Sequence, residues 1–96
     1  MLKLIWNPDA RKNVKAIVDF ITDRNPVAAM RMRRTFDDCA ERLTQHPYMY
    51  RSGRMAGTRE AVVHPNYIMI YEVGLDSVEI MAVVHSRQQF PPGDEG

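Results

Sequence analysis

The sequence of 96 residues has few of the features that mark extracellular, metal-bound or membrane proteins. Cys39 is its single cysteine, which excludes an internal disulfide framework and a cysteine-rich zinc site. The longest apolar run is far short of the ~20 residues that a membrane span needs. The apolar stretch over residues 1–6 is too short for a signal peptide. We therefore expect a cytosolic protein without a structural metal and without a membrane partner.

Motifs for nucleotides, cofactors and metals are also missing. The chain has neither a G-x-G-x-x-G fingerprint nor a Walker loop. Gly53 and Gly57 precede a predicted strand, whereas phosphate-binding glycine loops open a helix. The three histidines, His46, His64 and His85, do not have the spacing of metal ligands. No cofactor and no metal site are expected.

The amino-acid composition is typical of one small globular domain. Hydrophobic residues make up 45% and charged residues 26% of the chain, which is neither a disordered nor a fibrous mixture. We expect a single domain over residues 1–91 and a flexible tail over residues 92–96, where the chain is acidic after two prolines. A domain of this size buries one core and has no room for a large internal cavity. Any functional site should be a shallow surface or a groove.

The net charge of +1 hides an uneven distribution of arginine. Residues 24–59 contain eight arginines against three acidic residues. The planar guanidinium binds carboxylate or phosphate with two hydrogen bonds, unlike the point charge of lysine. Two interpretations stay open: a solvated helix face with ordinary ion pairs, or a surface for an anionic partner. That partner would be a nucleic acid or an acidic protein segment.

Two asparagine–proline pairs mark the boundaries between the predicted elements in the first half of the chain. Residues 2–6 read as a short apolar strand that Asn7-Pro8 closes. Apolar residues at helical spacing then predict a helix through about Arg24, with Asn7 as its cap. Asn25-Pro26 breaks this helix and opens a second one, which places Cys39 on its apolar face as a core residue. The two helices should fold back on each other as a hairpin.

The second half changes to the periodicity of strands. Strands are predicted over residues 59–64, 67–73 and 78–85, and short links join them as an antiparallel meander. The element order is β-α-α-β-β-β. The fold class is therefore α+β, with a small antiparallel sheet that the first strand can join and a two-helix hairpin packed on one face.

Two groups of residues are candidates for chemistry or recognition. The segment from Arg51 to Arg59 carries three arginines beside two glycines, so it is either an anion-binding loop or a mobile connector with exposed side chains. His85 ends the last predicted strand, with Arg87 two residues later. This pair is either a general acid with a phosphate clamp, as RNA cleavage requires, or a structural histidine that bonds a neighbouring strand or the tail.

Four motifs in order resemble a known family. They are His46–Tyr50, Gly53–Glu60, His64–Tyr71 and His85–Pro91. The series is similar to the RelE/ParE toxins of type II toxin–antitoxin modules, particularly the ParE-like (plasmid-stabilisation) branch, over nearly the whole chain. The resemblance implies a growth-inhibiting toxin that a cognate antitoxin neutralises in a hetero-oligomer. An acidic antitoxin segment would suit the arginines, so Arg31, Arg34, Arg51, Arg54 and Arg59 are candidates for partner binding.

The family divides by target, and this division decides whether the protein is an enzyme. RelE-like members resemble ribosome-dependent mRNA endonucleases. Carrying their pattern over gives Arg59 as a phosphate clamp, His85 as acid or base, and Arg87 as a second clamp. ParE-like members resemble DNA gyrase poisons, which bind a protein and perform no chemistry themselves. Residues 59–85 contain no lysine, and Tyr67–Tyr71 is apolar where nucleases place polar groups, so we favour gyrase over the ribosome and mRNA.

Overall fold

The first half of the chain forms a strand and two helices whose starts are set by asparagine and proline. The computed structural model describes residues 1–88 and 90. Strand β1 (Lys3–Trp6) leads into α1 (Pro8–Thr22), and α2 (Pro26–Gln45) follows after a tight turn. The Asn7 side chain accepts a hydrogen bond from the backbone N–H of Asp9, and Asn25 caps α2 in the same way. Both predicted helices and their hairpin are confirmed.

The second half adds four strands to β1 in one sheet. They are β2 (Arg51–Ser52), β3 (Arg59–His64), β4 (Tyr67–Val73) and β5 (Ser77–His85). The sheet order is β1-β5-β4-β3-β2, and β3, β4 and β5 form the predicted antiparallel meander. The α+β class and the succession of the predicted elements are confirmed. The two-residue β2 is an additional strand.

The sheet is mixed, because β1 joins the antiparallel meander in parallel. Strand β1 pairs with β5 in parallel, from Lys3 opposite Ser77 to Trp6 opposite Ile80. After the two helices and the meander turns, β5 runs in the same direction as β1. Two neighbouring strands that run in the same direction pair in parallel.

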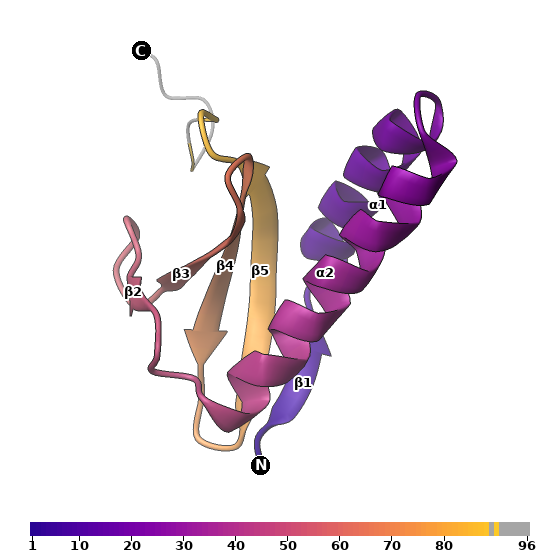
Figure 1. Ribbon diagram of the computed structural model, residues 1–96. Helices are drawn as coiled ribbons and strands as arrows, with labels where there is room; N and C mark the ends of the chain where they lie inside the picture. The colour runs from indigo at the N-terminus through magenta and orange to yellow at the C-terminus, as the bar shows by residue number, and fades with distance from the viewer. Residues whose placement is uncertain (89, 91–96) are drawn as a thin grey trace.

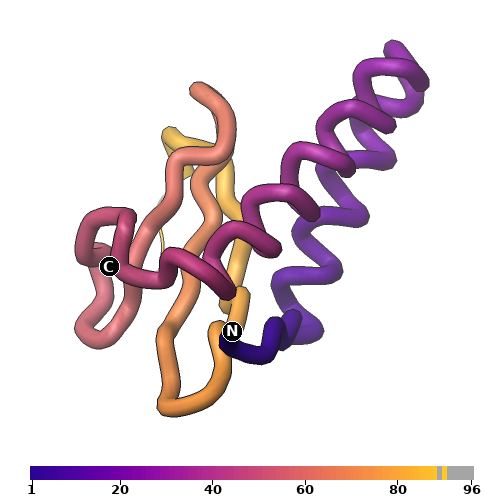
Figure 2. Tube along the Cα trace, turned by 60° about the horizontal axis from the view of Figure 1, so that its bottom comes forward, coloured from indigo at the N-terminus to yellow at the C-terminus, as the bar shows by residue number. Residues whose placement is uncertain are grey.

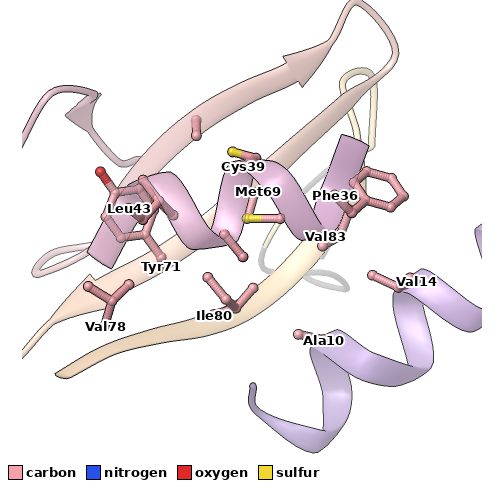
Figure 3. Close-up of a cluster of buried hydrophobic side chains, with 12 residues drawn as sticks. Ala10, Val14, Phe36, Cys39, Leu43, Met69, Tyr71, Val78, Ile80 and Val83 are labelled. Carbon is pink, nitrogen blue, oxygen red and sulfur yellow. The ribbon is translucent and has the colours of Figure 1, made fainter. Parts of the chain in front are cut away.

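The two helices cover one face of the sheet and bury the main core there (Figure 1; Figure 2). Phe36 and Leu43 of α2 pack with Met69 and Tyr71 of β4 and with Ile80 of β5 (Figure 3). Cys39 is buried in this core, as its place on the apolar stripe predicted, and burial raises the pKa of its thiol. These side chains are buried because the apolar face of the helix packs on the apolar face of the sheet.

The opposite face of the sheet, called here the outer face, carries a second and smaller apolar cluster. Ile68, Ile70, Ala82 and Val84 are buried there, and Met81 and Phe90 pack against them. Strand β4 is therefore buried on both faces at its centre, which explains its continuous apolar run. Among the described residues no helix covers the outer face.

The turn between α1 and α2 stands away from the sheet (Figure 1). Phe20, Val27 and Met30 near this turn are exposed. Neither helix of the described chain is long and apolar enough to cross a membrane. The tail that we predicted over residues 92–96 lies outside the described residues.

Candidate functional site

The loop between β2 and β3 is folded onto the sheet by its own backbone. The N–H of Gly53 donates to the carbonyl of Thr58 over 2.7 Å, and the N–H of Thr58 donates to the carbonyl of Met55 over 3.1 Å. Gly57 has a φ of 82°, a left-handed conformation that glycine adopts without strain. This candidate segment is thus a defined turn between two paired strands.

Glu60 of β3 holds this loop against the sheet through hydrogen bonds. Its carboxylate accepts hydrogen bonds from Nε and Nη2 of Arg54 over 2.6 and 3.1 Å, and from the backbone N–H of Arg54 over 3.0 Å. Arg51 adds a further bond over 3.3 Å. The Glu60 side chain is only 4% exposed. The Arg54 side-chain hydrogen bonds are the main cause that lowers the pKa of Glu60 to about 2, so it is ionised at neutral pH.

The charges of Arg51 and Arg54 are thus directed at an internal carboxylate. The sequence did not reveal the role of Glu60, because both interpretations of the segment, an anion-binding loop and a mobile connector, lacked the strand β2. The signal that would have found it is cross-strand register, since Arg51 lies opposite Glu60 in the β2–β3 pair.

Arg59 lies on the other face of the sheet and holds the segment that leads out of α2. Its Nη1 donates to the carbonyl of Tyr50 over 2.8 Å, and its guanidinium carbon lies 4.8 Å from the centre of the Tyr48 ring. Nearby, the hydroxyl of buried Tyr71 donates to the carbonyl of Pro47 over 2.7 Å. Burial is the main cause that raises the pKa of Tyr71 to about 12. Arg59 and Tyr71 together fix residues 47–50, with the Tyr48 ring exposed.

His85 sits in an aromatic group at the far end of the sheet. The Tyr67 ring lies between the imidazoles of His64 and His85, at 5.9 and 5.7 Å between ring centres. Nδ1 of His85 accepts the backbone N–H of Arg87 over 3.1 Å, so Nε2 is the nitrogen left for any other partner. This local hydrogen bond is the structural role that the sequence left open for His85.

The three nuclease candidates do not converge on one point. In the sheet Arg59 lies opposite Tyr71, whereas His85 lies opposite Tyr67, four residues away along β4. Counting that step and the two strand spacings between β3 and β5, the backbones of Arg59 and His85 are about 16 Å apart. The structure brings His85 and Arg87 together and leaves Arg59 at the other end of the sheet.

The partner-binding arginines also divide into separate groups. Arg31 and Arg34 are exposed on α2, and Arg34 borders a hollow of about 600 Å³ beside Met30. Arg51 and Arg54 lie with Glu60 at the β2 edge of the sheet, and Arg59 is bound to the segment after α2. The arginine excess between residues 24 and 59 is therefore not one continuous basic surface.

The outer face holds an open hollow of about 390 Å³. Ile70, Ala82 and Val84 line it from the sheet, and Met55 of the anchored loop borders it. Polar and charged residues, among them Asp9, Lys12 and Glu72, also line it, so the hollow offers a partner both apolar and polar contacts. The described residues contain no group of three or more histidine, cysteine or acidic side chains that could hold a metal ion.

Comparisons with known proteins agree with this architecture. Residues 4–90 match the family described as "ParE toxin of type II toxin-antitoxin system, parDE". A protein of Sinorhizobium fredii with the name "Putative toxin Y4kP" is 32% identical over 90 residues, which is 93% of each chain. Toxin RelE2 of Caulobacter vibrioides is 33% identical over 90 residues, covering 92% of this chain and 99% of its own.

A solved structure shows the same fold at low sequence identity. A chain of the chromosomal ParDE system from P. aeruginosa superposes with a TM-score of 0.78 at 17% identity, covering 88% of this chain and 96% of its own. The family match spans nearly the whole sequence, and both curated relatives align over almost their full length. The chain therefore belongs to the ParE toxin family of type II toxin–antitoxin systems.

Proposed function

We propose that this toxin is a ParE-like inhibitor of bacterial DNA gyrase in the cytoplasm, and that it acts by binding and performs no chemistry of its own. The observation that carries the proposal is the outer face of the sheet. The side chains buried there are aliphatic, and Arg51 and Arg54 at the β2 edge of the sheet bind the buried carboxylate of Glu60. Such a surface favours a protein target.

Ribose-phosphate cleavage needs its acid, base and phosphate contacts around one reacting group. Arg59 is half-buried and already donates to the Tyr50 carbonyl. The register also separates it from His85 by about 16 Å. This separation and the bond of Arg59 to the Tyr50 carbonyl do not favour joint contact with one scissile phosphate, which supports a non-catalytic toxin.

The side chains around Arg59 are of the kind that protein interfaces use as anchors. Tyr48 is 65% and Met49 is 57% exposed, and Arg59 holds their backbone in place. Tyrosine, methionine and arginine are enriched at protein interfaces, and anchors that are already ordered lose little entropy on binding. This segment is a second place where the target protein could be contacted.

The antitoxin is a partner that follows from the family, because a ParDE system pairs each toxin with one. We infer a hetero-oligomeric complex in the resting cell, in which the antitoxin keeps the toxin from its target. Arg31 and Arg34, which are exposed on α2, are the partner-binding candidates that remain accessible to an acidic antitoxin segment.

Purified toxin and purified gyrase test the proposal directly. We expect the toxin to inhibit supercoiling of relaxed plasmid or to trap gyrase-cleaved DNA. A Tyr48→Ala/Met49→Ala variant should lose this inhibition, while Val27→Ala, an exposed apolar change far from that segment, should retain it. Unimpaired supercoiling at toxin concentrations that stop growth would refute a gyrase target.

A RelE-like ribosome-dependent endonuclease is the second candidate, because the imidazoles of His64 and His85 flank the Tyr67 ring and could contact an RNA. Under this alternative, His85→Ala and Arg59→Ala would each abolish toxicity while antitoxin affinity stays nearly unchanged. Toxicity that persists in both folded variants would exclude the nuclease.

A further inference from the structure

The exposed face of α2 carries a stripe of charged side chains, called here the α2 charge stripe. Its members are exposed, and they are Arg31, Arg34, Asp38 and Glu41. The helical repeat sets their mean direction about 180° around α2 from the buried side chains of Phe36 and Leu43. The stripe therefore points away from the core, and it extends over about 15 Å along the helix.

The isolated protein does not pair these charges at short distance. The ion pair that the described chain forms on α2 joins Arg33 to Asp37 over 3.9 Å, beside the stripe. The ion pairs of the described residues include no member of the stripe. Pairing within the helix is also weakened by the order of the charges, because a base that precedes its acid by four residues has the less favourable orientation. The stripe is therefore free to pair with charges of another molecule.

The charges of the stripe are arranged symmetrically with opposite sign. The spacings are three, four and three residues, with the two arginines first and the two carboxylates last. An antiparallel second copy of α2, related by a twofold axis level with Phe36, places Arg34 opposite Asp38 of that copy. The same axis places Arg31 opposite Glu41 of the second copy, and each pair occurs twice. A parallel copy would instead bring like charges together.

Other charged partners match only half of the stripe. A nucleic acid would be attracted by the two arginines, but its phosphates would be repelled by Asp38 and Glu41. An acidic peptide laid along the helix would meet the same repulsion. A surface that is complementary to itself about a twofold axis is what a symmetric dimer requires. The charge pattern thus favours a second copy of this chain.

We propose that the free toxin forms a weak symmetric dimer in which the α2 charge stripes of two copies pack antiparallel. An exposed ion pair contributes little alone, so the dimer forms at high toxin concentration and low salt. Arg31 and Arg34 are also the candidates for an acidic antitoxin segment, so the dimer is a state of the toxin without its antitoxin. The proposal does not depend on gyrase as the target.

Sedimentation equilibrium of the purified free toxin tests the proposal. We expect a monomer–dimer equilibrium whose dissociation constant rises about tenfold or more between about 0.05 M and about 0.5 M NaCl, because salt screens exposed ion pairs. A toxin that stays monomeric at concentrations up to about 1 mM in low salt would refute the dimer. A dimer that is insensitive to salt would refute the charge stripe as its interface.

Two charge-reversal variants identify the surface. Arg31→Glu/Arg34→Glu makes the stripe wholly acidic, and Asp38→Arg/Glu41→Arg makes it wholly basic. Each variant alone should be monomeric, because like charges then face each other across the twofold axis. An equal mixture of the two should form a heterodimer at least as tight as the wild-type dimer. Self-association of either variant, or no association in the mixture, would overturn the proposal.

A matched control separates the stripe from the net charge. Lys3→Glu/Lys12→Glu makes the same change in net charge as the acidic variant, at exposed positions outside α2. Its dissociation constant should stay within about threefold of wild type, since distant exposed charges are screened. Circular dichroism verifies that all variants are folded. A control as monomeric as the acidic variant would show that net charge, and not the α2 charge stripe, governs association.

Discussion

Glu60 determines the structural role of two nearby arginines, Arg51 and Arg54. Three arginines over residues 51–59 looked like an anion-binding loop, yet a buried carboxylate binds two of them from within the sheet. A buried charge is stable only when it is paired and hydrogen-bonded, and Glu60 receives four such bonds. The single charge of Glu60 therefore balances one of the two arginine charges, and the Arg51 side chain stays 61% exposed.

Replacing Glu60 by glutamine should destabilise the fold. Glu60→Gln keeps the shape and removes the charge that Arg51 and Arg54 bind, so we expect the free energy of unfolding at pH 7 to fall by about 2 kcal/mol. Urea denaturation followed by circular dichroism measures this loss. Glu72→Gln, at an exposed position on β4, serves as the control and should change stability by less than about 0.5 kcal/mol.

The same residue predicts how stability depends on pH. The pKa of Glu60 is lowered from 4.5 to about 2 in the folded protein, so the folded state favours the ionised form. Its stabilising contribution is present above pH 4.5 and is lost as the pH falls from 4.5 towards 2. The difference in unfolding free energy between wild type and Glu60→Gln should shrink over that range. A difference that stays constant between pH 7 and pH 3 would contradict the ion-pair account.

Tyr71 offers a second test at the residue scale. Tyr71→Phe removes the hydrogen bond to the Pro47 carbonyl and should lower the free energy of unfolding by about 1 kcal/mol at pH 7. In the folded protein the pKa of Tyr71 is raised from 10.0 to about 12, so wild type should lose stability as the pH rises between those values, and the variant should lose less. Denaturation at pH 7 and pH 11 measures both effects; equal curves for the two proteins at both pH values would show that the hydroxyl contributes nothing.

At the scale of elements, Gly57 fixes the turn that carries Met55 over the outer face. A Cβ at this position would have open space, but the φ of 82° strains any residue with a side chain. Gly57→Ala should cost about 1 kcal/mol of unfolding free energy, and Gly57→Asn should cost less because asparagine tolerates this conformation. Thermal unfolding of the two variants gives the order. An alanine variant as stable as wild type would mean that the loop can adopt another turn.

The helices and the three main strands could be predicted from local signals, whereas the site could not. Asn7 and Asn25 mark both helix starts because capping and proline geometry act within a few residues. Strand β2 is only two residues long and leaves no periodic pattern, so its partner Glu60 was missed as well. The parallel pairing of β1 depends on how distant segments meet, which local sequence does not encode. The distance between Arg59 and His85 is likewise a product of strand register.

At the scale of the whole molecule, the two faces of the sheet have different roles. The helices cover one face and provide the core, whereas among the described residues no helix covers the outer face, which we propose as the surface for a protein target. A domain of 96 residues has no room for a deep active site, and its arginines are distributed among separate structural positions. This arrangement is consistent with our proposal that the toxin recognises a macromolecule across its surface.

The order in which macromolecular synthesis stops after toxin induction tests this account most directly. Cells are pulse-labelled in parallel for DNA, RNA and protein synthesis during the first minutes of expression, with the antitoxin-bound toxin as the control. A gyrase-binding toxin should depress DNA synthesis first and induce a DNA-damage response with filamentation, while translation continues. If translation stops first and transcripts are cut in the ribosomal A site, the toxin is a nuclease and the account is wrong.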